Sequence, residues 1–412
     1  MADEQVVSVE QHLAGVLEGI TPLEPIEQTL LDSQGLMLAE NIISGVTLPS
    51  FDNSAVDGYA VRMVDTRMAS AESPVVLPVV GDVVAGAKSR SGMGPGLAMR
   101  IMTGAPIPAG ADAVIRLEDT DRGVAKVALF RPAQSGEAIR RAGEDLVPGA
   151  PALGAGAALG PQQIALLAAL GRDRVRVLPR PRVVVVSTGS ELVDVSQPPA
   201  FGEVVDSNSY LITAAARDAG ADAYRIGIVP DDHSRLLEVL EGQRLRADII
   251  ITTGGVSMGA FDVVKQALSD LGTVHFVKVA MQPGRPQGFG HIGGRTPIFC
   301  LPGNPVSALV SFEVFVRPAI RRMLGKRTIQ RATVQATVLE RIDSRAGVRQ
   351  YRRGVLHREA NGDYSVTLVG GPGSHLIAAL AAANCLVVVP EEVTEVAVGS
   401  RMTVIPLLLS HR

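Results

Sequence analysis

Aromatic residues are scarce in this sequence and tryptophan is absent: Phe, Trp and Tyr together make up 3% of its 412 residues. Proteins that bind single-stranded nucleic acid stack the bases on aromatic side chains, so this scarcity argues against that class. A formal net charge of −3 provides no general attraction to DNA or to a membrane surface. Hydrophobic residues make up 46%, enough for large aliphatic cores, so we expect a globular chain in which any anion site is local.

Cysteine is almost absent too. Cys300 and Cys385 each lie in an apolar run, no Cys-x-x-Cys occurs, and the seven histidines are scattered. We therefore predict two buried, reduced thiols and no zinc cluster. No apolar run reaches the roughly 18 residues of a membrane span, and the first residues, MADEQVVSVE, are acidic and polar, unlike a signal peptide. The expectation is a cytoplasmic protein that binds neither membrane nor nucleic acid.

The texture of the sequence changes near residues 46, 140, 180 and 327. Apolar spacing predicts two amphipathic helices between residues 7 and 44, separated at ITPLEP. Residues 47–140 contain short Val-rich runs between Gly and Pro, which are typical of strands and turns. Loop and helix return at 146–171, and the sequence after 325 again predicts strands, in a small C-terminal sandwich or barrel.

Between these β-rich parts, β-branched strands alternate with helices, which predicts a mainly parallel sheet covered on both faces. The expected strands are RVVVVSTG, YRIGIVPDD, ADIIITTGG and VHFVKVAM, the last followed by a hairpin over GFGHIGGRTPIFCLPGNP. The expected helices are SYLITAAARDAG, HSRLLEVLEGQRL, DVVKQALSDLG and a long apolar helix from residue 306.

Three of these strands end in turns rich in Gly, Ser, Thr or Pro that open helices. Ligands of open parallel sheets bind beyond the carboxyl ends of the strands, and free N–H groups at helix starts favour anions. Three such turns on one edge predict a backbone cradle for an anionic ligand. Its candidate residues are Ser187, Thr188, Gly189, Thr253, Gly254, Gly255, Ser257, Pro302, Gly303, Asn304 and Pro305.

Carboxylates follow the strand ends at the same edge. Alone, each would be a helix cap or a turn acid; together, beside an anion cradle, they indicate a hard divalent cation such as Mg²⁺ that bridges ligand phosphates. Lys278 and Arg285 add positive charge after the next strand. The acids in question are Glu191, Asp206, Asp231 and Asp262.

The pattern G-x-S-x-G at 255–259 offers a hydrolase alternative with Ser257 as the nucleophile. The acid and histidine that such a site needs would have to be Asp262 and either His275 or His291. Asp262 lies on the helix that directly follows the serine, His275 in a strand and His291 in a hairpin. This arrangement disfavours the hydrolase, and the cradle is the preferred interpretation.

Two phosphate-binding signatures also fail. The pattern G-x-x-x-x-G-K-[ST] does not occur. G-x-G-x-x-G occurs at 288–293, but it leads into a turn and a strand, whereas a dinucleotide site requires a helix there.

Nine ordered stretches resemble the MoeA family of molybdopterin molybdenumtransferases, which includes the gephyrin E domain. The matches span most of the chain, so the resemblance is specific. They are LPSFDNSAVDGYAVR (48–62), GDVVAGA (81–87), RIMTGAPIPAGADAVI (100–115), RRAGEDL (140–146), STGSEL (187–192), GIVPDD (227–232), TTGGVSMGAFD (252–262), MQPGRPQGFG (281–290) and LPGNPVSA (301–308).

The resemblance implies a four-part subunit of a homodimer. The parts would be an elongated helical N-terminal domain (1–45 plus 141–180), a β-rich inserted domain (46–140), a molybdopterin-binding α/β domain (181–327) and a C-terminal β-barrel-like domain (328–412). In this family the inserted domain faces the α/β domain of the partner subunit, so the site would be shared across the interface.

The resemblance also implies an activity: Mg²⁺-assisted insertion of molybdate into adenylylated molybdopterin, with release of AMP. Pro302 and Pro305 fall in the family's ligand-facing loop, and Asp206 is assigned to substrate binding. We expect catalytic roles for Asp57, Thr103, Glu191, Asp231, Lys278 and Arg285, and Mg²⁺ ligation by Glu191, Asp231 and Asp262.

One motif departs from the family pattern. Where the family often has Lys-Pro-Gly-Lys-Pro, this chain has QPGRP, so Gln282 and Arg285 replace two lysines. Arginine keeps the charge and can bind an oxyanion with two hydrogen bonds, whereas Gln282 is neutral. Two alternatives to the transferase remain: a molybdopterin-binding carrier or scaffold without turnover, and the adenylylation of molybdopterin.

Overall fold

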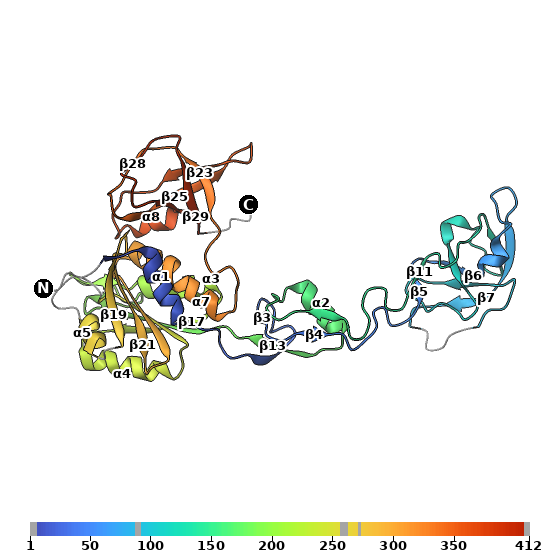
Figure 1. Cartoon of the computed structure of the whole chain (residues 1–412), viewed down its shortest axis with the longest axis horizontal. Coiled ribbons are helices and arrows are strands. Elements are labelled where there is room, and N and C mark those ends of the chain that lie inside the picture. Colours follow the sequence, from blue (N-terminus) through green and yellow to red (C-terminus); the bar gives the residue numbers. More distant parts are fainter. Residues whose placement is uncertain (1–5, 87–91, 256–262, 271–272, 408–412) are drawn as a thin grey trace. The chain divides into compact units, whose positions relative to one another are not determined.

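The computed structural model describes residues 6–86, 92–255, 263–270 and 273–407. The chain forms two compact units (Figure 1). The first unit comprises residues 1–28, 35–39 and 176–412, and the second comprises residues 29–34 and 40–175. Each unit is described by itself.

The first unit is built on a seven-stranded sheet with the order β1-β19-β21-β22-β18-β14-β17. All neighbours are parallel except the two pairings of β21, so the predicted mainly parallel sheet and its hairpin are confirmed. The strands are β1 (Val6–Val7), β14 (Arg182–Thr188), β17 (Asp222–Val229), β18 (Ile249–Thr253), β19 (Val274–Val279), β21 (Pro286–Ile292) and β22 (Thr296–Leu301).

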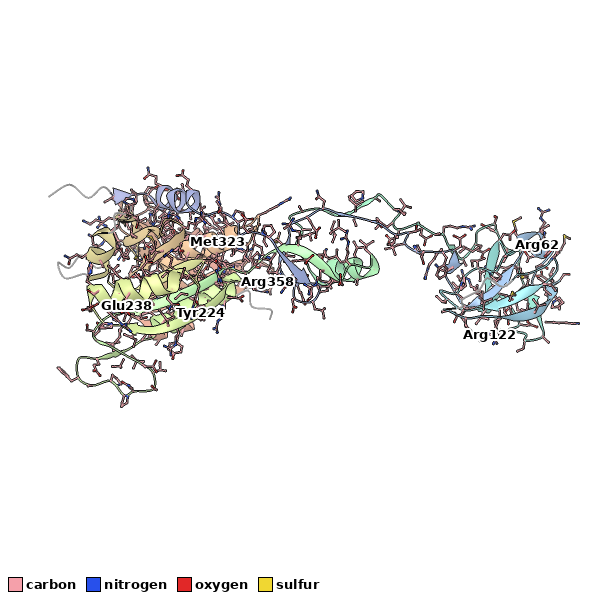
Figure 2. All side chains as sticks on the ribbon, turned by 90° about the horizontal axis from the view of Figure 1, so that it is seen from below. Arg62, Arg122, Tyr224, Glu238, Met323 and Arg358 are labelled. Carbon is pink, nitrogen blue, oxygen red and sulfur yellow. The ribbon has the colours of Figure 1, made fainter. Side chains whose placement is uncertain are left out.

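Helices cover both faces of this sheet because its central strands are apolar on both sides. Residues 183–186 of β14 are all fully buried, and alternate side chains enter two different cores. Met323 and Glu238, labelled in Figure 2, lie on the two sides. The helices are α1 (Val9–Glu18), α3 (Asn208–Ala219), α6 (Pro305–Ser311), the π-helical turn η3 (Phe312–Val316) and α7 (Arg317–Met323) on one face, and α4 (His233–Arg244) and α5 (Val263–Asp270) on the other.

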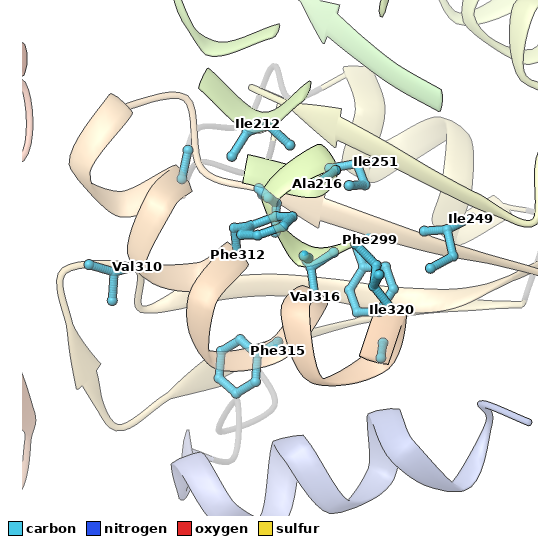
Figure 3. Packing of buried hydrophobic residues seen from close by; sticks show 14 of the residues in the cluster. Ile212, Ala216, Ile249, Ile251, Phe299, Val310, Phe312, Phe315, Val316 and Ile320 are labelled. Atoms are coloured by element: carbon cyan, nitrogen blue, oxygen red, sulfur yellow. The ribbon is translucent and has the colours of Figure 1, made fainter. Parts of the chain in front are cut away.

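The core beside α6, η3 and α7 is continuous with the strands. Figure 3 shows Phe312 and Val316 near Ile251 of β18 and Ile212 of α3, and all four side chains are fully buried. The long apolar helix predicted from residue 306 is therefore confirmed, with one π-helical turn inside it. This packing fixes the Pro-Gly-Asn-Pro loop, which immediately precedes α6.

The C-terminal part of the first unit is a closed five-stranded barrel in the order β25-β26-β23-β29-β27, with β27 returning to β25. The prediction of a C-terminal barrel-like domain is thus confirmed. A sixth strand, β20, leaves the α/β part and pairs with β25. The elements are β20 (Met281–Gln282), β23 (Val334–Val338), β24 (Ile342–Asp343), β25 (Arg349–Arg358), β26 (Tyr364–Leu368), α8 (Ile377–Ala382), β27 (Cys385–Val389), β28 (Glu395–Val396) and β29 (Arg401–Pro406).

The second unit contains a five-stranded sheet with the order β10-β7-β8-β6-β9, which confirms the β-rich texture of residues 47–140. Residues 141–171 contribute one short strand and one helix. The elements are β4 (Ile42–Ile43), β5 (Asn53–Ser54), β6 (Gly58–Val61), η1 (Met63–Thr66), β7 (Val75–Val83), β8 (Ala98–Ile101), β9 (Ala113–Arg116), η2 (Leu117–Asp119), β10 (Lys126–Leu129), β11 (Ile139–Arg140), β12 (Pro151–Leu153) and α2 (Pro161–Ala169).

The prediction of two helices between residues 7 and 44 was wrong in its second half. Only α1 forms; after it the chain makes the short strands β2 (Ile26–Thr29), β3 (Met37–Leu38) and β4. β2 and β3 flank β13 (Arg174–Leu178), and β4 pairs with β12. Partners more than 100 residues away in the sequence supply the hydrogen bonds, so helical spacing of Leu and Ile was outweighed. The elongated N-terminal part is therefore less helical than expected.

Two further expectations concern cysteine and membranes. Cys300 and Cys385 are buried and free, as predicted, and burial raises the pKa of the Cys385 thiol to about 12. Within the described ranges, no helix is long and apolar enough to cross a bilayer.

Candidate functional site

The carboxyl ends of β14, β18 and β22 lie side by side because these three strands are adjacent and parallel. Their turns touch. The Gly254 amide donates to the Leu301 carbonyl at 3.1 Å, and the Thr188 hydroxyl donates to the Thr253 carbonyl at 3.3 Å. The structure thus brings together the three turns that the sequence suggested as a cradle. Ser257 and Asp262, which follow β18, lie outside the described residues.

Gly254 makes this close approach possible. Its φ is +94°, which is costly for any residue with a side chain, and an added Cβ would lie 2.5 Å from the Thr188 carbonyl oxygen. A side chain here would therefore separate the ends of β14 and β18.

Asp206 lies beneath the turns, where its carboxylate is buried and accepts several hydrogen bonds. Oδ1 accepts from the Ser187 hydroxyl at 2.8 Å and from the Ser209 amide at 3.0 Å, and Oδ2 accepts from the Ser209 hydroxyl. The Ser187 oxygen is in turn 3.0 Å from the Thr253 hydroxyl. Asp206 therefore joins the end of β14 to the start of α3 and is occupied by protein donors, whereas the sequence suggested a direct contact with substrate.

We expect Asp206→Ala to lower the free energy of unfolding by about 2–4 kcal/mol, because three buried donors lose an ionised acceptor. Asp206→Asn retains one oxygen acceptor and should lose less. Urea denaturation of the three proteins, followed by circular dichroism, measures the difference. Equal stability of wild type and Asp206→Ala would show that the carboxylate does not hold these elements together.

Glu191 and Asp231 flank the turn that follows β14. The Ser190 amide donates to Asp231 Oδ2 at 3.1 Å, and the Asp231 amide donates to the Ser190 hydroxyl at the same distance. The Glu191 carboxylate folds back over Gly189, since a Cβ on Gly189 would lie 2.6 Å from Glu191 Oε2. Both acids are exposed, so they can meet a ligand that occupies the edge.

These acids form an all-oxygen donor set suited to Mg²⁺. The part of the chain that the structure describes has no group of three acids, histidines or cysteines placed to hold a metal. Mg²⁺ does not require one, because it keeps several waters and is commonly held by one or two carboxylates together with substrate phosphates. Glu191 and Asp231 satisfy that requirement.

The QPGRP segment crosses from the α/β part to the barrel. Gln282, on β20, accepts a 3.4 Å hydrogen bond at Oε1 from Gln350 Nε2 of β25. Arg285 is exposed in the turn before β21, and Lys278 is half-buried near the end of β19. The structure therefore places Gln282 against the barrel rather than among the Gly-rich turns.

Gln282 also lines a cavity of about 270 Å³ between the two parts, which the sequence analysis missed. Three arginines and one acid contribute to its wall, so the local charge is positive. The Ser344 hydroxyl is buried and has no hydrogen-bond partner among the described residues. The lining residues are Gln282, Pro283, Val306, Asp343, Ser344, Arg345, Gln350, Tyr351, Arg352, Arg353, Val369, Gly370, Gly371 and Pro372.

Two of these arginines lack a carboxylate among the hydrogen-bond partners that the structure describes. Arg353 donates to the carbonyls of Val369, Gly371 and Gly373, while Arg352 makes only long bonds, of 3.4 and 3.5 Å. Burial lowers the pKa of both guanidinium groups, and the charge of Arg352 lowers that of Arg353 further. An anion in the cavity would relieve this unfavourable concentration of positive charge. The run RQYRRG was the one available sequence signal: a strand with three arginines.

In the second unit, the structure brings Asp57 and Thr103 together. Asp57 Oδ1 accepts from the Thr103 amide at 2.6 Å and from its hydroxyl at 2.8 Å. These bonds, the amide bond first, lower the pKa of the exposed Asp57 carboxyl, so it is ionised at neutral pH. Asp57 precedes β6 and Thr103 follows β8, two paired strands, which explains how residues 46 positions apart meet.

Comparison with known proteins places these features in one family. Family profiles match in three consecutive regions: the MoeA N-terminal region (domain I and II) at residues 7–171, a probable molybdopterin binding domain at 184–322, and the MoeA C-terminal region (domain IV) at 335–407. The matched molybdopterin domain contains the turns, the acids and Gln282.

Whole-chain relatives agree. The chain is 46% identical to molybdopterin molybdenumtransferase 1 of Mycobacterium tuberculosis over 95% of this chain and 97% of that protein. It is 35% identical to the Haemophilus influenzae molybdopterin molybdenumtransferase over 97% and 98%. A crystal structure of the MoeA protein from Pyrococcus horikosii superposes with a TM-score of 0.83, at 32% identity, over 98% of this chain and 100% of that one.

The fold and the site thus define a multidomain protein with a molybdopterin-binding type of α/β domain joined to a closed barrel. The chain belongs to the MoeA family of molybdopterin molybdenumtransferases.

Proposed function

We propose that this chain is a molybdopterin molybdenumtransferase of molybdenum cofactor biosynthesis, which inserts molybdate into adenylylated molybdopterin and releases AMP. The names of its relatives support the enzymatic assignment. The reaction must bring together two anions, molybdate and a substrate with phosphates, that repel each other. The site supports this task because it separates a place for phosphates from a place for a small oxyanion.

The observation that carries the proposal is the arginine-lined cavity beside Gln282. Its volume of about 270 Å³ is below the roughly 300–1,000 Å³ typical of pockets for larger organic ligands. It therefore suits molybdate rather than the pterin nucleotide. Val306 lines the cavity and belongs to the first turn of α6, directly after the Pro-Gly-Asn-Pro turn of the cradle. An oxyanion in the cavity would thus lie close to a ligand in the cradle.

We assign the phosphates to the cradle. Free amides of the turns after β14, β18 and β22 would receive them, with Pro302–Pro305 shaping the third turn and Lys278 and Arg285 supplying charge. Glu191 and Asp231, with Asp262 from beyond the described residues, would hold Mg²⁺, which supplies charge neutralisation to the phosphates when bound. Binding and orientation of both anions is the contribution of the protein.

We further propose that the chain acts as a homodimer and retains the four-part division drawn above, with Asp57 and Thr103 serving the α/β domain of the partner subunit. An ionised, exposed Asp57 supports this, because within its own unit it is held only by Thr103 and faces solvent. Two buried free thiols fit a reducing compartment, and we place the reaction in the cytoplasm.

A molybdopterin carrier without turnover is the second candidate, and it is not favoured. Such a carrier needs the cradle, but it has no use for Glu191 and Asp231 as an exposed pair. Incubation with adenylylated molybdopterin, Mg²⁺ and increasing molybdate tests the choice. The enzyme predicts AMP release that rises with molybdate, whereas AMP release unaffected by molybdate would contradict the proposal.

Gln282→Lys is expected to lower the molybdate concentration that gives half-maximal AMP release, by roughly three- to tenfold. Lysine would add a full charge to the cavity wall, and hydrogen bonds between ionised groups are about twice as strong as those with a neutral partner. The titration should be made at low ionic strength, because salt screens the difference. Gln335→Lys, on the distant strand β23, is the control. An unchanged or higher half-maximal concentration in Gln282→Lys would show that the arginines already suffice.

A further inference from the structure

Phe201 is the most exposed large apolar residue of the described chain: its side chain is 108% accessible. It lies in the loop that joins β15 (Leu192–Val193) to β16 (Val204–Val205) and follows two prolines. Burying a phenyl ring stabilises a folded protein by about 1.5–3 kcal/mol, and this ring gains nothing from the fold. In a chain with nine phenylalanines, such exposure requires an explanation.

The loop that carries Phe201 is held in place. β15 and β16 pair in parallel at its base. Asp194 binds Arg225 of β17 at 3.2 Å, and the Arg225 guanidinium stacks 4.0 Å from the ring centroid of Tyr210. Nearer the tip, the Ala200 amide donates to the Glu203 carboxylate at 2.8 Å. The phenyl ring is therefore presented on a supported arm.

This arm grows out of the candidate site. It begins directly after Glu191, one of the two exposed acids, and ends at Asp206, which binds Ser187 beneath the cradle. Five residues separate Phe201 from Asp206, so the ring lies within about 17 Å of the cradle, the length of that segment when fully extended.

We propose that Phe201 is a stacking platform for a flat heteroaromatic ring of the ligand whose phosphates the cradle holds. The inference rests on the proposed function, which gives the ligand two such rings, a pterin and an adenine, on either side of its phosphates. Aromatic side chains bind such rings through their faces without needing a specific hydrogen bond. Phe201 would thus bind a ring, while backbone amides bind the phosphates.

The size of the exposed surface favours a small ligand over a protein partner. The other large apolar side chains exposed on the arm are Val195 and Val204, at 53% and 56%. A phenyl ring and two half-exposed valines fall far short of the roughly 800 Å² that each side of a stable protein interface buries, but they match one bicyclic ring.

The absence of tryptophan from the chain allows a direct test. Phe201→Trp introduces a single indole at the platform, and Leu245→Trp, at the exposed end of α4, is a matched control. Emission is titrated separately with AMP and with 6-hydroxymethylpterin, in the presence of Mg²⁺. We expect saturable quenching of Phe201→Trp by at least one probe, which identifies the ring, and none of Leu245→Trp.

Affinity provides the second readout. Equilibrium dialysis of the quenching probe should show binding about tenfold weaker for Phe201→Ala than for wild type, and restored by Phe201→Tyr. Unquenched emission from Phe201→Trp, together with equal affinity of wild type and Phe201→Ala, would overturn the inference and leave a protein contact as the role of the ring. Molybdate-dependent AMP release is scored independently, so quenching without that activity would refute the proposed function and support the platform.

Discussion

Asp231→Asn is expected to lower the rate of AMP release on the order of 100-fold, the size of effect seen when one charge-stabilising group is removed from an active site. Asparagine keeps the shape of the side chain and an oxygen that can accept from the Ser190 amide, so the turn after β14 should persist. What is lost is the negative charge that would help to hold Mg²⁺. Since Asp231 is exposed, its removal should hardly change stability.

The measurement is AMP release at saturating molybdate and matched Mg²⁺, with circular dichroism as a check on folding. Asp232→Asn is a matched control, because its side chain caps α4 through the Arg235 amide and has no part in the site. A rate within threefold of wild type for Asp231→Asn would remove this acid from the mechanism.

The same variant tests the shared site. Mixed with Asp57→Ala chains under subunit exchange, Asp231→Asn chains should form some hybrid dimers in which one site has both acids. Neither variant alone should be active, and the mixture should recover up to about a quarter of the wild-type rate, half of the dimers being hybrids with one of two sites intact. No recovery after verified exchange would place Asp57 and Asp231 in the site of a single chain.

Arg352→Met should raise the half-maximal molybdate concentration by roughly 10- to 100-fold, since a hydrogen bond to a charged group contributes about 1.5–3 kcal/mol. Arg352 is suited to this test because its own bonds to protein are long, at 3.4 and 3.5 Å, so little of the fold depends on it. Methionine preserves the length and apolar bulk of the side chain.

Arg358→Met is the control, because Arg358 is exposed at the far end of the same strand (Figure 2). Molybdate is titrated against AMP release at saturating pterin substrate. An unchanged half-maximal concentration in Arg352→Met would locate oxyanion capture outside the cavity.

The sequence predicted the α/β sheet because its signal is local. Residues 183–186 and 249–251 are unbroken β-branched runs, and only a strand buried on both faces tolerates such runs. The meeting of the three turns follows from parallel neighbours. Asp231 and Glu191 could be placed at the edge for the same reason.

The sequence could not predict features that depend on partners far away in the chain. Leu38 and Ile42 have helical spacing from earlier apolar residues, yet residues near 152 and 177 pair with them as strands. Asp206 resembled the other edge acids until Ser187 and Ser209 enclosed it. The cavity unites Gln282 with Arg352, 70 residues later, through the pairing of β20 with β25, and no local pattern announces that pairing.

The central claim is that release of AMP and insertion of molybdenum are one event. The most direct measurement is the ratio of molybdenum bound to the pterin product, determined by elemental analysis after separation from free molybdate, to AMP released in the same incubation. The account predicts a ratio of one throughout the reaction, with both quantities close to zero in Asp231→Asn. AMP released without molybdenum in the pterin would contradict it and would assign this chain a hydrolytic role.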